Sequence, residues 1–238
     1  MTGTLINVAT VLVGTAVGST VGARLSQGIQ DRVMSGLGLI TLVIGVDLAL
    51  SWSGPGTTSH TTLFVLGGIL IGGIVGEAID IESRLEGFGA LLQRRLSPNR
   101  ESRLSEGFVN ASLLFCVGSM TVVGSIQDGL TGDYQVLAAK AVLDGFAAVA
   151  LSAALGWGVG LSAISILLLQ GTVTLGAGVF DQFLRGEALA AMTSAGGITI
   201  IGIGLKLLGV KDVRVGNYLP ALIIAPALVG LAKLAGIT

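Results

Sequence analysis

Long apolar stretches separated by short polar turns run through the whole chain. A helix needs about 20 mostly apolar residues to cross a lipid bilayer. Lipid offers the backbone no hydrogen-bond partner, so each continuous stretch of this length is predicted to be a helix. The predicted spans are residues 3–22, 34–52, 61–81, 108–127, 137–157, 160–180, 188–209 and 216–236. The fifth and sixth spans meet at the short sequence "GWGVG", so the pattern predicts seven or eight helices. The predicted fold is an all-α polytopic membrane protein that forms one transmembrane domain over residues 1–238.

The composition agrees with a chain that is surrounded by lipid. Of its 238 residues, 52% are hydrophobic and 11% are charged, whereas a globular domain usually carries about 25% charged residues. The mean hydropathy is +0.88, and so few charges cannot cover the surface of a soluble fold of this size. The net charge of −1 gives no basic surface for binding nucleic acid.

Residues that commonly carry catalysis are sparse. Cys116, the single cysteine, excludes an internal disulfide and lies in an apolar run, where we interpret it as a packing residue. His60, the single histidine, sits in a Gly/Thr/Ser loop without a nearby ligand partner. No nucleophile has a base within reach by spacing, so the sequence predicts no enzyme, no metal site and no cofactor.

The basic residues predict the orientation of the chain in the membrane. They concentrate in the first, third and seventh loops, and cytoplasmic loops are the ones enriched in Lys and Arg. This places both termini outside the cytoplasm. In the third loop, residues 82–106 carry Leu and Phe at helical spacing against Arg and Glu. That segment is predicted to be an amphipathic helix at the cytoplasmic interface, or a solvated linker with helical propensity.

Glycines repeat every four residues on two predicted helices. The first helix has Gly14, Gly18 and Gly22, and the third has Gly68, Gly72 and Gly76. Such stripes let helices approach closely, and we interpret them as packing faces within the chain. The same faces would also serve a homo-oligomer.

A weak internal similarity relates the two halves of the chain. "GLITLVIGVDL" (38–48) resembles "GITIIGIGLKL" (197–207), and "GTAVG" (14–18) echoes "GTVTLG" (171–176). In the predicted orientation the matched helices run in opposite directions, which is typical of the inverted repeats of secondary transporters. Glycine-rich apolar strings also match by chance, and the sequence does not separate the two explanations.

Polar side chains inside the apolar spans are the candidate functional residues, because such groups are costly in a bilayer. At 1.5 Å of rise per residue, one group falls in the outer third of the membrane and is expected to bind a cation or exchange a proton. Lys140 and Asp144 are four apart on one helix and are predicted to pair. Asp128, in "GSIQDGL", lies at a helix C-terminus, where a negative charge opposes the helix dipole. We therefore expect a cation beside it, either Lys140 or a transported ion. The outer group comprises Asn7, Asp47, Gln127, Asp128, Lys140 and Asp144.

A second polar group falls at the inner helix ends, and one amide lies between the groups. The inner group comprises Glu77, Asp80, Lys206 and Asn217, and Gln170 is predicted near the midplane. This arrangement has the outline of a path for a small ion or solute, so the chain is interpreted as a transporter or channel. The alternative is a structural or regulatory membrane protein whose polar groups all pair internally.

Several strings are closely similar to one family. "LLFCVGSMTVVGSIQDGLTGDYQVL", "KAVLDGFAAVALSAALGWGV", "LLLQGTVTL" and "VRVGNYLPALIIAPAL" resemble domain-of-unknown-function family 554, as do "GTLINV" and "GIVGEAIDIESRLE" in the N-terminal half. The resemblance implies an integral protein of the bacterial cytoplasmic (inner) membrane, of the kind often labelled a possible transporter or channel. It implies no substrate.

Overall fold

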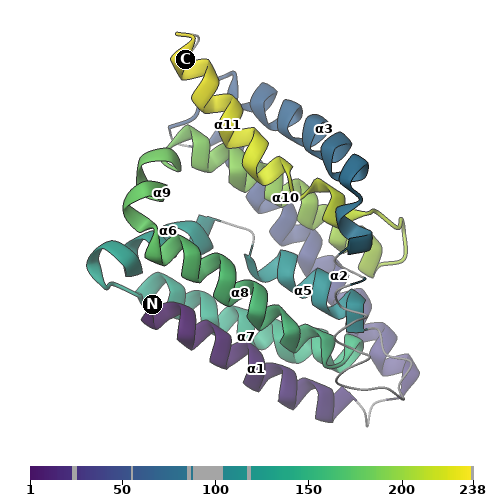
Figure 1. The fold of residues 1–238 in the computed structure, drawn as a ribbon. Coiled ribbons are helices and arrows are strands. Elements are labelled where there is room, and N and C mark those ends of the chain that lie inside the picture. Colours follow the sequence, from purple (N-terminus) through teal and green to yellow (C-terminus); the bar gives the residue numbers. More distant parts are fainter. Residues whose placement is uncertain (23–25, 55, 85–86, 88–103, 117–118, 237–238) are drawn as a thin grey trace. The chain divides into compact units, whose positions relative to one another are not determined.

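The computed structural model describes residues 1–22, 26–54, 56–84, 87, 104–116 and 119–236, and this part of the chain is helical and contains no strand (Figure 1). The helices, labelled as in Figure 1, are α1 (Thr2–Gly22), α2 (Gln27–Ala49), α3 (Thr61–Ile79), α5 (Leu104–Cys116), α6 (Ser119–Thr131), α7 (Gln135–Leu155), α8 (Gly158–Leu175), α9 (Ala177–Phe183), α10 (Glu187–Leu207) and α11 (Ala221–Leu234). Two short 3₁₀ helices, η1 (Leu50–Ser53) and η2 (Val215–Tyr218), extend α2 and precede α11. Most of the predicted amphipathic segment 82–106 lies outside the described residues.

The predicted class of fold, a polytopic helical bundle, is confirmed. Within the described residues, seven helices are long and apolar enough to cross a membrane. The fourth predicted span differs from the prediction of one continuous helix over residues 108–127. It is divided into α5 and α6, which are bent by 62° relative to each other, and it becomes the eighth span if the pair is counted as one.

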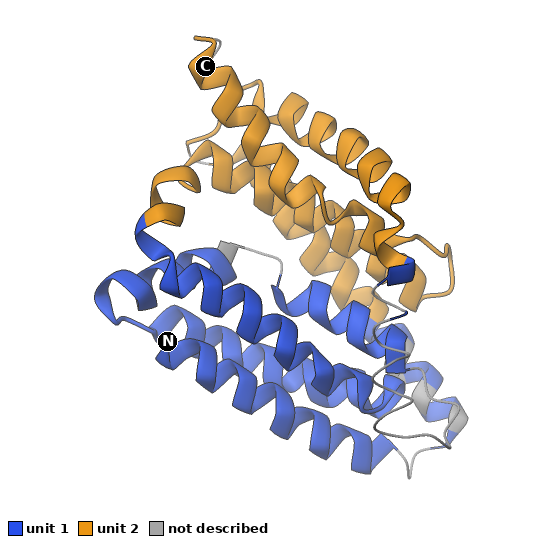
Figure 2. Ribbon diagram, in the orientation of Figure 1, with its two compact units in different colours: residues 1–37, 83–116, 120–178 blue, residues 38–82, 117–119, 179–238 orange. Residues whose placement is uncertain are grey.

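The chain forms two compact units, which are described separately (Figure 2). Unit 1 comprises residues 1–37, 83–116 and 120–178, and it contains α1, α5, α7 and α8 with most of α6. Unit 2 comprises residues 38–82, 117–119 and 179–238, and it contains α3, α10 and α11 with the second half of α2.

In unit 1, the glycine stripe of α1 packs directly on the backbone of α7. A Cβ atom added to Gly14 would lie 2.4 Å from the carbonyl oxygen of Gly145, and one on Gly18 would lie 2.1 Å from that of Val149. A Cβ atom on Gly22 would lie 2.2 Å from the carbonyl oxygen of Ala153. Only glycine permits so close an approach, and the contacts advance together along both helices, so α1 and α7 run parallel.

In unit 2, the glycine stripe of α3 packs on α11 and on the turn before it. The positions of Gly68 and Gly72 face Ala225 and Ala221, and a Cβ atom on Gly76 would lie 1.8 Å from the carbonyl oxygen of Asn217. Both predicted glycine faces are therefore used for packing within the chain. A homo-oligomer would need other surfaces.

Helices α2 and α10, which carry the repeated sequence, pack against each other symmetrically in unit 2. A Cβ atom on Gly45 would lie 3.0 Å from the carbonyl oxygen of Gly197, and one on Gly197 would lie 2.7 Å from that of Gly45. Gly38 and Gly204 face each other in the same way. A Cβ atom on Gly38 would lie 3.3 Å from the carbonyl oxygen of Gly204, and one on Gly204 would lie 3.1 Å from that of Gly38. The sequence match aligns Gly38 with Gly197 and Gly45 with Gly204, so a two-fold rotation that exchanges the helices reproduces both contacts. The two helices therefore pack antiparallel through their glycines.

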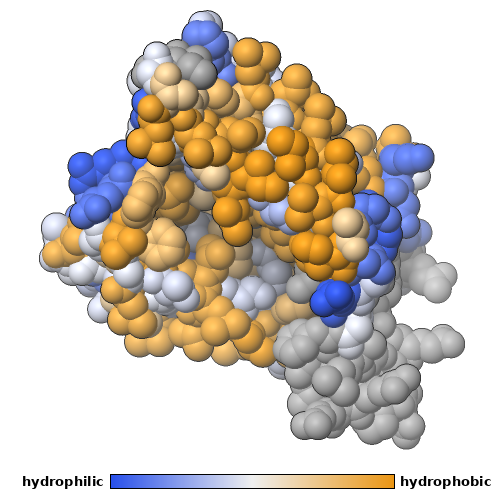
Figure 3. Space-filling model, turned by 45° about the horizontal axis from the view of Figure 1, so that its top comes forward, coloured by the Kyte–Doolittle hydropathy of each residue, from blue (hydrophilic) through white to orange (hydrophobic). Residues whose placement is uncertain are grey.

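The outer surface carries the apolar side chains that a bilayer requires. Figure 3 shows hydrophobic side chains over much of one face, with hydrophilic groups gathered toward its margins. Large apolar side chains are strongly exposed on many helices, and such patches exceed what a soluble monomer presents. Examples are Val43, Ile74, Phe146, Leu175 and Ile223.

Candidate functional site

The centre of the candidate site is the ion pair of Lys140 and Asp144 on α7. The Lys140 ammonium contacts Oδ2 of Asp144, as predicted from their spacing of four residues. Both side chains are nearly buried, with exposed fractions of 7% and 10%. A buried charge is tolerated only when it is paired and hydrogen-bonded, and each of these two charges has a second partner.

Asn7 of α1 is the second partner of Asp144. Its Nδ2 donates to Oδ2 of Asp144 at 2.9 Å, and its side chain is fully buried. The close glycine packing of α1 on α7 brings the two residues together, because Asn7 lies two turns before Gly14. The Oδ1 atom of Asn7 has no hydrogen-bond partner among the described residues.

The second partner of Lys140 is a backbone group at the end of α5. Its ammonium donates to the carbonyl oxygen of Phe115 at 2.7 Å. Phe115 lies in the last turn of α5, where a carbonyl lacks the intrahelical donor that it would have in mid-helix. A cation at a helix C-terminus is also favoured by the helix dipole. The ammonium thus takes a carbonyl oxygen that a continuous helix would use internally.

Asp128 has a different partner from those expected. Its Oδ2 accepts the backbone N–H of Gly3 at 3.1 Å and lies 2.9 Å from the amino group of Met1. Both donors belong to the N-terminus of α1, which favours a negative charge. The unfavourable position of Asp128 at the end of α6 is thus offset by its position at the start of another helix. The glycine that follows it, Gly129, lets α6 approach α8 closely, because a Cβ atom there would lie 2.2 Å from the carbonyl oxygen of Thr174.

Unit 1 also holds buried polar atoms that lack a partner among the described residues. Gln170 of α8 is fully buried, and neither its Nε2 nor its Oε1 is hydrogen-bonded. Its neighbour Gly171 lies near the Met1 side chain, because a Cβ atom added to Gly171 would lie 3.6 Å from Cε of Met1. The turn of α8 that holds Gln170 therefore lies near the start of α1. Further unpartnered atoms in this unit belong to Thr4, Asn7, Thr15, Asn110, Ser125, Gln127 and Thr174.

Asp47 lies in unit 2, where it is exposed and makes no hydrogen bond or ion pair with any described residue. Its depth along α2 does not determine the face from which its side chain projects.

The predicted inner group forms a paired network in unit 2, organised by Glu82. This buried carboxylate accepts from the backbone N–H of Gly216 at 2.9 Å and from Nζ of Lys206 at 3.3 Å. Its own backbone N–H donates to Oδ1 of Asn217 at 2.8 Å. Lys206 also pairs with Asp212, at 3.2 Å.

The remaining members of the inner group meet at the end of α3. Asn217 donates through Nδ2 to Glu77 at 2.6 Å, and Arg214 donates to Glu77 at 2.8 Å and also to Asp80. The hydrogen bond with Asp80 raises the pKa of the Arg214 guanidinium above its ordinary value, so this group stays charged. Asp80 itself ends α3 in the left-handed conformation, with φ of 54°.

Sequence reasoning missed several polar residues that the structure shows to be important. Glu82 and Arg214 were assigned to loops, although Glu82 follows the end of α3 directly. Glu187, at the start of α10, is buried and accepts from the hydroxyl groups of Thr58 and Thr61 at 2.5 and 2.6 Å. The sequence signal for Glu187 is an acid directly before the predicted span 188–209.

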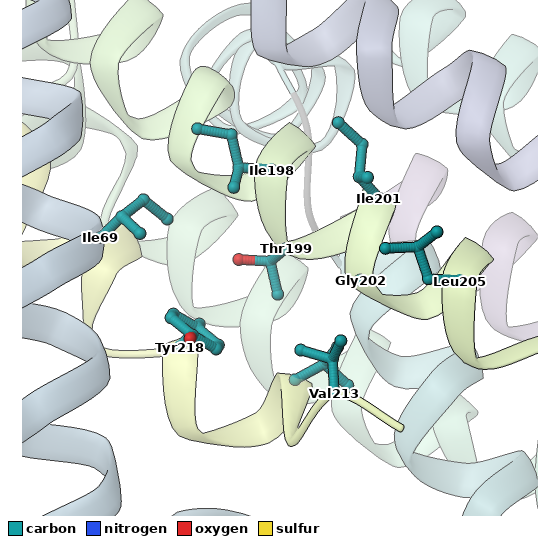
Figure 4. A pocket seen from close by; sticks show the side chains of 9 residues that line it. Ile69, Ile198, Thr199, Ile201, Gly202, Leu205, Val213 and Tyr218 are labelled. Carbon is teal, nitrogen blue, oxygen red and sulfur yellow. The ribbon is translucent and has the colours of Figure 1, made fainter. Parts of the chain in front are cut away.

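A pocket of about 260 Å³ lies within unit 2 (Figure 4). Its walls are almost entirely apolar, and the Thr199 hydroxyl donates to the carbonyl oxygen of Ala195 within its own helix. The pocket therefore offers little to a small ion. It is lined by Ile69, Ile198, Thr199, Ile201, Gly202, Leu205, Val213, Val215 and Tyr218. Among the described residues, no cluster of three or more His, Cys, Asp and Glu side chains is arranged to hold a metal ion.

The apolar spans, the exposed apolar surface and the buried charges define a polytopic α-helical membrane protein. The chain belongs to the family described as "Protein of unknown function (DUF554)", whose model matches residues 2–230. It is 30% identical over 229 residues to the uncharacterized membrane protein YdfK of Bacillus subtilis (strain 168), covering 96% of each chain. It is 29% identical over 227 residues to the uncharacterized protein YqgA of Escherichia coli (strain K12), covering 94% of each. No solved structure matches the chain.

Proposed function

We propose that the protein is not an enzyme but a transporter or channel, which passes a small ion or solute across the bacterial cytoplasmic membrane through the polar interior of unit 1. The observation that carries this proposal is the buried group formed by Lys140, Asp144 and Asn7 among otherwise apolar helices. Ionisable groups in such positions commonly mark substrate or ion pathways. The unpaired amide of Gln170 adds polar capacity that packing alone does not require.

The orientation is part of the proposal. With both termini outside, α7 enters the membrane from the outer side at Gln135, and Asp144 lies about 14 Å along the helix from that residue. A solute arriving from outside would meet the pair before reaching the centre of the membrane. The network around Glu82 would then face the cytoplasm.

The second candidate function is structural or regulatory, without transport. The inner network favours it, because Glu82, Lys206 and Asn217 all have partners within unit 2. Asp128 favours it too, since its contacts with the start of α1 are those of a helix cap. The two candidates therefore differ chiefly in what the Lys140 and Asp144 pair does.

A flux screen distinguishes the two candidates. Purified protein in liposomes would be tested with alkali cations, halide and phosphate anions, and amino acids, and empty liposomes would serve as the reference. Transport predicts that at least one solute enters faster than into empty liposomes. Equal rates for all of them would support the structural role.

A further inference from the structure

The surroundings of the Lys140 ammonium are those of a bound monovalent cation. Its contacts are a carboxylate oxygen of Asp144 and the backbone carbonyl oxygen of Phe115. Phe115 lies at the end of α5, the first helix of the bent pair α5 and α6. In transporters, carbonyl groups at the ends of discontinuous helices and nearby carboxylates coordinate Na⁺ or a proton-bearing group. Here the positive charge in that position belongs to the protein itself.

The structure also offers an oxygen ligand that is not in use. Asn7 donates to Asp144 through Nδ2 while its Oδ1, on a fully buried side chain, has no partner among the described residues. Rotation of an amide by 180° exchanges its oxygen and nitrogen. Asn7 can therefore donate to the free carboxylate and can also present its oxygen to a cation bound there.

The charge of the group selects a monovalent cation. Asp144 supplies one negative charge, and the other oxygen ligands are neutral. Divalent calcium usually takes six to eight oxygen ligands, several of them carboxylates, and no cluster of that kind occurs among the described residues. A single carboxylate with neutral oxygens balances a charge of +1.

We propose, resting on the transport function above, that Lys140 and Asp144 form a site that exchanges a proton for a monovalent cation. When the cation binds to the Asp144 carboxylate, the Lys140 ammonium releases one proton to water and becomes a neutral amine. The total charge is unchanged, because one positive charge enters the site as another leaves. In the reverse step, the amine takes up a proton and the ammonium displaces the cation from the carboxylate and the Phe115 carbonyl.

Other titratable groups near the pair are few. Cys116 of α5 lies close enough to interact with both charges. On α6 and α1, the nearest charges are Asp128 and the Met1 amino group, which pair with each other. Helix α8 carries no titratable residue. Lys140 is in direct contact with the Asp144 carboxylate, so we assign to it the proton released on cation binding.

The test is proton release on cation binding in detergent solution. Sodium or potassium chloride is added to the purified protein in weak buffer with a pH-sensitive dye, and choline chloride at equal ionic strength is the reference. Wild-type protein should release one proton for each alkali cation bound. Lys140→Met should bind the cation without proton release. Asp144→Asn should release no proton, and its affinity for the alkali cation should fall by about a hundredfold, because the charged partner is removed.

The wild-type measurement decides the proposal even if a variant does not fold. Alkali-cation binding without proton release, or no binding at all, would overturn the exchange mechanism. Release that persists in Lys140→Met would assign the proton to another group and would also overturn it. Solute flux in liposomes without proton release would leave the transport function standing, so the two failures are distinguishable. Asp181→Asn is the matched control and should behave as wild type. Asp181, on α9, pairs with Arg185, and the exposed fractions of the two side chains are 23% and 68%.

Discussion

Asn7 donates through Nδ2 to Oδ2 of Asp144 at 2.9 Å, and this bond joins residues that are 137 positions apart in the chain. It lies in the glycine-packed interface of α1 and α7, so the helix contact and the polar group depend on each other. A change in the packing is expected to disturb the polar group, and the following predictions separate the two effects.

The first prediction concerns the packing itself. In Gly18→Ala, the new Cβ atom would lie 2.1 Å from the carbonyl oxygen of Val149 and 2.2 Å from Oγ of Ser152. We expect a loss of about 1–3 kcal/mol of stability from overpacking, measured by thermal unfolding in detergent. Gly36→Ala is the matched control, because a Cβ atom there meets nothing within 4 Å. It should be neutral or stabilising by up to about 1 kcal/mol, since alanine favours the helix.

The second prediction concerns the buried ion pair. Lys140→Met and Asp144→Asn each leave one charge without its partner, so each should cost about 3–5 kcal/mol. The double variant should cost less than the sum of the two, because no charge is left unpaired. The measurement is a double-mutant cycle of thermal unfolding. Additive costs would show that the two side chains do not interact as the structure describes.

The exposed pair of Arg185 and Asp181 provides the control for that cycle. It has the same spacing of four residues, but its side chains are more exposed, at 68% for the arginine and 23% for the aspartate. An exposed pair of this kind usually contributes about 0–1 kcal/mol. The same two neutralisations there should change the unfolding temperature little.

The third prediction concerns Asp128. Because its carboxylate accepts the N–H of Gly3 at the start of α1, Asp128→Ala should cost about 0.5–2 kcal/mol, as expected for a lost helix cap. Asp31→Ala, which removes a carboxylate from an exposed position of α2, should have little effect. If Asp128→Ala were as stable as wild type, the carboxylate would not act as a cap for α1.

The sequence predicted the helices well because hydropathy is a local property. The pairing of Lys140 with Asp144 was also accessible, since residues four apart on a helix are neighbours. The partner of Asp128 was not, because Gly3 lies 125 residues away and contributes a backbone N–H that any residue carries.

The other misses have similar causes. The carbonyl oxygen of Phe115 has no signature in the side-chain sequence, and it becomes available only where α5 ends. Asp47 was placed with the outer group by its depth, but depth does not give the helix face or the compact unit. Glu82 is predicted in the third loop because the hydrophilic segment 82–106 begins there, and its role could not be predicted because its partners on α10 and η2 are distant in sequence.

The fourth prediction tests the orientation. In a Cys116→Ala background, single cysteines at the exposed positions Ser59 and Lys211 report on opposite ends of the helices of unit 2. A membrane-impermeant thiol reagent added to intact cells should label the cysteine at 59 and should label the one at 211 only after lysis. The reverse pattern would place both termini in the cytoplasm and would put the Lys140 and Asp144 pair on the inner side.

The measurement that tests the central claim most directly is alkali-cation flux in liposomes that contain either the Asp144→Asn or the Asp181→Asn variant. Both variants remove one carboxylate charge, but only the first removes it from the buried group of unit 1. We predict that Asp144→Asn reduces flux to the rate of empty liposomes while its helical content is retained, and that Asp181→Asn transports as wild type does. Wild-type flux through folded Asp144→Asn protein would contradict the claim that the polar interior of unit 1 is the path.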